Sequence, residues 1–140
     1  MRDGGADPVT PTRHLRSVGA GCSFRWVSSD ARKEAAELLG RDPGAQAELT
    51  ALLQRMLAGT LRRNRDYKQF QMIEGEPALF ELTLDSAQPR LRLYFIEEGD
   101  EDGVRATGLA LTEKPRGGTP REQRARQNED AARAYGRRPM

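Results

Sequence analysis

The chain has few of the side chains on which many enzymes and secreted proteins depend. Its 140 residues contain one cysteine, Cys22, and one histidine, His14. A single cysteine excludes a disulfide within the chain. An isolated histidine argues against both a zinc site and a histidine-based catalytic triad. The sequence also has no Walker loop, no GxGxxG motif and no internal repeat. We therefore expect neither a metal nor a cofactor.

Long hydrophobic runs are absent as well. No apolar stretch approaches the ~20 residues of a membrane-spanning helix, and Met1–Gly21 has no hydrophobic segment resembling a signal peptide. Hydrophobic residues make up 36% of the chain and charged residues 31%. This composition favours a cytoplasmic protein with no membrane partner.

The net charge is small, but the charges are segregated along the chain. The total is +2, yet Lys114–Arg138 carries eight basic residues against three acidic ones. Basic residues also crowd Arg62–Lys68, and acidic residues gather in Glu97–Asp102. Such segregation permits an anionic partner, and an ordinary solvated helix face explains it equally well.

The length is that of one domain with a core of its own. Residues 1–21 are rich in Gly, Pro, Thr and Arg, and we expect a disordered extension there. The folded domain is expected over residues 22–136, and residues 137–140 are expected to form a flexible end.

Apolar periodicity predicts the elements of the first half. Residues 22–27 alternate like a short strand. Ser28–Asp30 offers helix caps, and Gly40 ends the helix that follows. A second helix is expected from Pro43 to near Arg63, with leucines and a methionine at helical spacing.

Three strand-like runs follow, at residues 80–84, 91–96 and 104–111. The first two alternate with period two and are separated by turn-forming residues, which is typical of an antiparallel meander. The third run is less regular. Gly108 inside it indicates either a bulge or a strand covered on both faces.

Thr119-Pro120-Arg121-Glu122 predicts the start of a terminal helix. Thr119 can cap the helix, Pro120 fits its first position, and Glu122 can reach back to Thr119. The order is then strand, two helices, three strands and a helix. We expect an α+β fold with helices on one face of an antiparallel sheet of three to four strands.

The strand over residues 91–96 has one polar face. Arg90, Arg92 and Tyr94 alternate with Leu91, Leu93 and Phe95, and Lys114 and Arg116 lie just past the next strand. Arginines hold phosphates with two parallel hydrogen bonds, and a tyrosine can stack on a base or handle a proton, so this face could bind nucleic acid. In the alternative interpretation, the two arginines pair with Glu81 or with the acidic turn across the strands.

These residues together resemble the RelE/HigB superfamily of toxins, and most closely its phage-derived branch. The family pattern has an E-L-R strand, a Y-R-[VIL]-x-Y strand, a strand ending in F-x-K-K, and K-T-P-x-x-E opening a helix. The corresponding residues here are Glu81-Leu82, Arg90–Phe95, Lys114, Thr119-Pro120 and Glu122. The resemblance covers roughly Phe24–Tyr135.

The resemblance implies a toxin of a type II toxin–antitoxin pair. Such a toxin cuts mRNA on the ribosome without a metal and is neutralised by a cognate antitoxin, here expected to be a small helix-turn-helix protein. The catalytic candidates that it implies are Arg92, Tyr94 and Lys114, with Tyr135 as a weaker one. The RNA-binding candidates are Arg90, Arg116, Arg121 and Arg124.

The chain also departs from the family pattern. Thr83 stands where the E-L-R arginine would be, and the F-x-K-K end reads Leu111-Thr112-Glu113-Lys114. A toxin homologue that has lost catalysis therefore remains an alternative. So do a basic nucleic-acid-binding or regulatory protein and a protein-interaction domain.

Overall fold

The computed structural model describes residues 14–73, 75–87, 89–100 and 103–139. In these ranges the elements are β1 (Ser23–Trp26), α1 (Ser29–Gly40), α2 (Pro43–Ala58), β2 (Tyr67–Gln69), β3 (Phe80–Leu84), β4 (Leu91–Asp100), β5 (Gly103–Glu113) and α3 (Pro120–Tyr135). The expected α+β class is confirmed. None of the helices described is long and apolar enough to cross a membrane.

The strands of the described residues form one five-stranded sheet in the order β1-β5-β4-β3-β2. β1 runs parallel to β5, and the other neighbouring pairs are antiparallel. The sheet is therefore mixed and larger than the antiparallel sheet of three to four strands that we expected. β2 was not predicted from the sequence, because a strand of three residues is too short to show the alternation of apolar and polar residues. After the two helices the chain re-enters the sheet at β2, and the antiparallel run β2-β3-β4-β5 then brings β5 beside β1 in the same direction.

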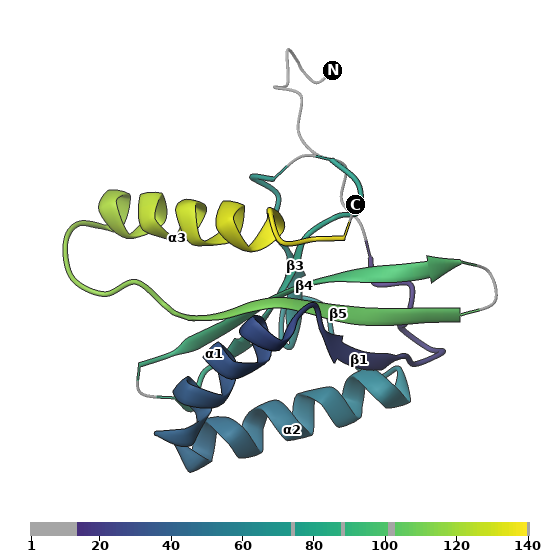
Figure 1. The fold of residues 1–140 in the computed structure, drawn as a ribbon. Coiled ribbons are helices and arrows are strands. Elements are labelled where there is room, and N and C mark those ends of the chain that lie inside the picture. The colour runs from purple at the N-terminus through teal and green to yellow at the C-terminus, as the bar shows by residue number, and fades with distance from the viewer. Residues whose placement is uncertain (1–13, 74, 88, 101–102, 140) are drawn as a thin grey trace.

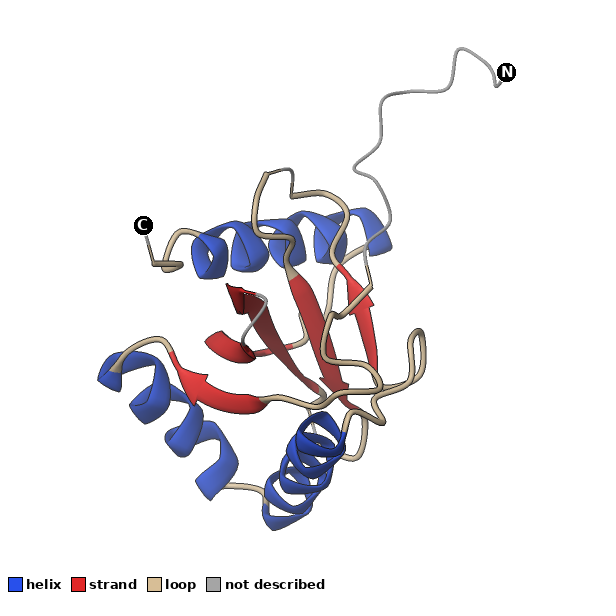
Figure 2. Cartoon of the chain, turned by 90° about the vertical axis from the view of Figure 1, so that its right-hand side faces the viewer, coloured by secondary structure: helices blue, strands red, loops and turns tan. Residues whose placement is uncertain are grey.

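The helices cover both faces of the sheet (Figures 1 and 2). α1 and α2 lie on one face, where Met56 packs in the same core cluster as Leu93. α3 lies on the other face, where Ala131 belongs to a second cluster with Tyr94 and Ile96. Our expectation of helices on one face was wrong for α3. The reason is that β4 carries apolar side chains on both of its faces.

A bulge in β5 contributes to this two-sided core. The ladder to β4 pairs Tyr94 with Ala110 and Phe95 with Gly108, so Leu109 is the extra residue. Leu109 and Ala110 consequently both belong to the cluster beneath α3. Both expectations for Gly108 hold, because it adjoins a bulge and is itself buried.

The helix ends follow local capping chemistry. At the start of α3, the Thr119 side chain accepts a hydrogen bond from the Glu122 backbone, and the Glu122 carboxylate accepts one from the Thr119 backbone. The predicted capping box is therefore confirmed. α2 ends at Ala58 and not near Arg63, because Gly59 adopts a left-handed conformation with φ 76° that terminates the helix.

The segment before β1 packs against the sheet. Leu15 is 4% exposed and belongs to the core. The Glu97 carboxylate on β4 accepts hydrogen bonds from the backbone N–H groups of Arg16 and Ser17, at 2.6 and 2.9 Å. The packed part of the chain therefore begins before Cys22, the residue at which the sequence predicts the start of the domain. Residues 1–13 lie outside the described residues, and residues 137–139 follow α3.

Gly108 provides a test of the packing between β1 and β5. A Cβ at this position would lie 2.5 Å from Phe24 Cζ and 2.9 Å from Trp26 Cε3. We expect Gly108→Ala to lower the free energy of unfolding by about 2 kcal/mol, because the rings must shift. Denaturant unfolding measures this change. Gly40→Ala is the control, since nothing lies within 4 Å of the Cβ it would add. Equal stability of the two variants would contradict the packing described.

Candidate functional site

One end of the sheet carries a depression of about 220 Å³, which we call the strand-end depression. It lies where β4 begins and β5 ends. Its cationic lining residues are Arg65, Lys68, Arg90, Arg92 and Lys114. They come from the loop before β2, from β2 itself, from the start of β4 and from the residue after β5.

The sheet register brings three of the predicted residues together. Arg92 pairs with Thr83 on β3 and with Thr112 on β5. The backbone N–H of Lys114 donates to the carbonyl of Arg90 at 2.7 Å. Because side chains alternate along a strand, Arg90 and Arg92 point to the same face of the sheet. Lys114, the residue after β5, lies opposite Arg90. Arg90, Arg92 and Lys114 therefore line one depression, as the sequence led us to expect.

A fully buried carboxylate fixes Arg92. Glu81 on β3 is 0% exposed, and its Oε2 lies 3.4 Å from Arg92 Nη1 while its Oε1 lies 3.2 Å from Lys68 Nζ. Arg92 Nε has no hydrogen-bond partner among the described residues. The structure therefore contains the Arg92–Glu81 ion pair that the sequence offered as an alternative to nucleic-acid binding. This ion pair orients Arg92, which also lines the depression.

Arg90 makes a weaker pair. Its Nε lies 3.7 Å from Asp85 Oδ1, and both side chains are more than half exposed. Such a pair contributes little to stability and is screened by salt. Arg90 therefore remains accessible to an anion from solvent.

The structure does not bring Tyr94 to this site. Its side chain is 1% exposed and packs against Phe70, with ring centroids 6.0 Å apart, in the cluster beneath α3. Burial, together with the charge of Glu81, raises the pKa of the Tyr94 phenol. The phenol therefore stays protonated and out of reach of a ligand. Tyr135 also lies elsewhere, because its hydroxyl donates to the Pro77 carbonyl at 2.7 Å.

The basic surface continues past the strand-end depression. A neighbouring depression of about 450 Å³ shares Arg90 and Lys114 with it and adds Arg116. A third, of about 490 Å³, is also lined by Lys114 and Arg116 and reaches α3, where its lining mixes basic and acidic side chains. The predicted RNA-binding candidate Arg116 therefore lies on the same basic surface. Arg121 and Arg124 are exposed on α3 and line none of these three depressions.

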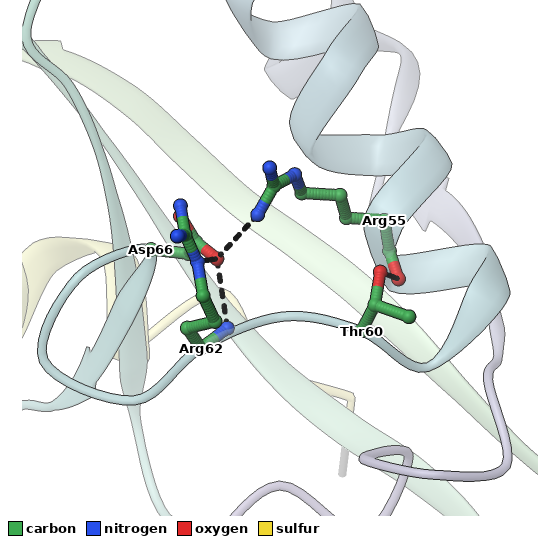
Figure 3. Close-up of polar contacts among 4 residues, drawn as sticks. All are labelled: Arg55, Thr60, Arg62 and Asp66. Carbon is green, nitrogen blue, oxygen red and sulfur yellow. Dashed lines mark hydrogen bonds and ion pairs between the residues drawn. The ribbon is translucent and has the colours of Figure 1, made fainter.

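The loop over residues 62–66 forms another part of the lining, and Asp66 holds it in place (Figure 3). Asp66 Oδ2 accepts hydrogen bonds from Arg62 N at 2.8 Å, Arg62 Nε at 3.1 Å and Arg55 Nη1 at 3.3 Å. Burial by itself would raise the pKa of the Asp66 carboxyl. The hydrogen bonds from Arg62 and the charges of Arg62 and Arg55 outweigh this effect and lower the pKa.

Sequence reasoning did not assign this loop, or Lys68, to the site. The basic cluster at Arg62–Lys68 is visible in the sequence. Its place in the strand-end depression depends on the pairing of β2 with β3, which aligns Lys68 with Glu81. A three-residue strand gives no signal from which that pairing could be predicted.

No protein-family model matches the chain, and no curated protein or solved structure is significantly similar to it. The chemistry of the site therefore has to be inferred from its own residues. Within the described ranges, no group of three or more His, Cys, Asp or Glu side chains could hold a metal ion. The side chains present can bind phosphate and can stabilise negative charge that develops on it.

The lowered pKa of Asp66 makes its contribution to stability depend on pH. We expect Asp66→Asn to lower the free energy of unfolding by about 2 kcal/mol at pH 7, because the hydrogen bonds to a charged acceptor are lost. Since the folded-state pKa lies below the unfolded value of about 3.9, this contribution is complete above that pH and is lost as the pH falls through the folded-state value. Urea unfolding of both proteins from pH 7 to pH 3 measures it. A difference that is constant over this range would contradict the assignment.

The buried ion pair predicts a larger effect. Glu81→Gln removes the charge that compensates Arg92, and we expect it to lower the free energy of unfolding by about 3 kcal/mol. The matched control is Asp85→Asn, which breaks the exposed pair with Arg90 and should cost less than about 1 kcal/mol. Chemical denaturation of both variants makes the comparison. Similar small losses would show that Glu81 does not hold Arg92.

Proposed function

We propose that the chain binds single-stranded RNA along the basic surface and cleaves it in the strand-end depression, as a RelE/HigB-like toxin would. Its target would be mRNA on the ribosome, and its inhibitor a cognate antitoxin. The observation that carries the proposal is that Arg92 and Lys114, far apart in the sequence, line one depression together with Arg90. Both were implied as catalytic by the resemblance.

RNA cleavage requires positive charge that stabilises the transition state. In RNA cleavage the 2′-oxygen loses its proton and attacks the adjacent phosphorus, and the 5′-oxygen leaves and takes up a proton from water. Negative charge accumulates on the phosphoryl oxygens during this step. Arg92, oriented by Glu81, and Lys114, whose side chain has no partner among the described residues, are the groups that would stabilise this charge. Asp66 is occupied by its arginines. Asp85 is then the lining carboxylate left to accept the proton of the 2′-hydroxyl.

A second candidate function is RNA binding without cleavage. The burial of Tyr94 favours it, because the proposed catalytic tyrosine cannot contact a substrate in this conformation. Thr83 also favours it, since it lines the depression at the position where the family pattern has an arginine. Such a protein would keep the basic surface and act through binding alone.

Induced expression in a bacterial host tests the proposal. We expect growth arrest by the wild type and cleavage of translated mRNA mapped by primer extension. Lys114→Ala should relieve both, because its ammonium stabilises charge and makes no hydrogen bond or ion pair with a described residue. Lys33→Ala, an exposed charge on α1 on the other side of the sheet, is the matched control and should still arrest growth.

RNA binding by the purified proteins separates the two candidates. Lys114→Ala should weaken the binding of short RNAs regardless of sequence and reduce the slope of log affinity against log salt by about 0.7. RNA binding without arrest or cleavage would support the second candidate. Neither arrest nor RNA binding by a folded wild type would contradict both.

A further inference from the structure

The 62–66 loop supplies a different kind of chemistry from the rest of the strand-end depression. Most of the cations there suit a phosphate group. The loop contributes Asn64, Arg65 and Asp66 to the lining, and the Asn64 side chain is an amide. An amide carries a hydrogen-bond donor and an acceptor side by side, the pattern that matches the edge of a nucleobase.

The loop is held rigidly by its own backbone. The N–H groups of Asp66 and Tyr67 both donate to the Arg62 carbonyl, at 2.7 and 3.2 Å. The Asn64 N–H donates to the Tyr67 carbonyl at 2.6 Å. The buried Asp66 carboxylate also accepts hydrogen bonds from Arg62 and Arg55 (Figure 3). These bonds together fix the loop before any ligand binds. A fixed loop loses little conformational entropy on binding.

Asn64 stands out within this loop. Its φ is 66°, which makes it the one described non-glycine residue with a left-handed backbone. Asparagine tolerates this conformation better than most residues. Its side chain is exposed and makes no hydrogen bond to any described residue. A free amide, held on a fixed loop beside five cations, is therefore available to a ligand.

We propose that Asn64 reads the base of the nucleotide whose phosphate lies among Arg92 and Lys114, and that Asp66 positions it by fixing the loop. This inference rests on the proposed RNA-binding function and adds a determinant of sequence preference. Single-stranded RNA is the appropriate ligand class, because its base edges are free to be read. The phosphate contacts supply affinity, and the amide supplies discrimination.

Asn64→Gly is the variant that isolates the amide. Glycine adopts φ 66° without strain, so the backbone is kept while the side chain is removed. The probes are the four RNA hexanucleotides A6, C6, G6 and U6, whose affinities for the full chain are measured at fixed salt. We expect the wild type to prefer one of them, and Asn64→Gly to bind that one about five- to tenfold more weakly. Its affinities for the other three should stay unchanged.

Lys114→Ala provides the contrast, because the loss of a phosphate contact should weaken binding of all four RNAs by a similar factor. Thermal unfolding of each variant checks that the fold is retained. If the wild type binds RNA but binds all four equally, or if Asn64→Gly keeps the wild-type preference, Asn64 does not read the base. If the wild type binds none of the four, the proposed function fails and the inference fails with it.

Discussion

The organisation of this molecule depends on the carboxylate of Glu81 on β3, which is fully buried. A buried charge is costly unless other charges compensate it. Here Lys68 on β2 and Arg92 on β4 compensate it from either side, at 3.2 and 3.4 Å. Three strands are thereby joined at the same end of the sheet. Arg92 is itself 7% exposed and lines the strand-end depression.

The distribution of apolar residues explains why this end of the sheet stays open. The β5 bulge sends Leu109 and Ala110 to the same face, beneath α3. The buried residues of α3 are confined to its last part, Ala131, Ala134 and Tyr135. Its first part, residues 120–130, contributes no buried residue and therefore does not seal the strand ends. Lys114 and Arg116 remain on the surface where β5 leads into α3.

Much of the fold could be predicted because its signals are local. The capping box at Thr119, the alternation in β3 and β4, and Gly108 in β5 all act through neighbours in the sequence. The rest depends on distant contacts. The alternation around Tyr94 identifies its face of the sheet, but whether that face meets water or α3 depends on where the last helix packs. The loop at Asp66 likewise joins the site only through β2, which is too short to show a pattern.

The most direct test of the account is to locate RNA on the surface. Backbone amide shifts of the ¹⁵N-labelled full chain, recorded during titration with a short single-stranded RNA, would do this. We expect the largest changes at residues 64–68 and at Arg90, Arg92, Lys114 and Arg116, which line the strand-end depression and its neighbour. Changes concentrated on α1 and α2, or no changes at saturating RNA, would contradict the claim that the cations around Arg92 form an RNA-binding site.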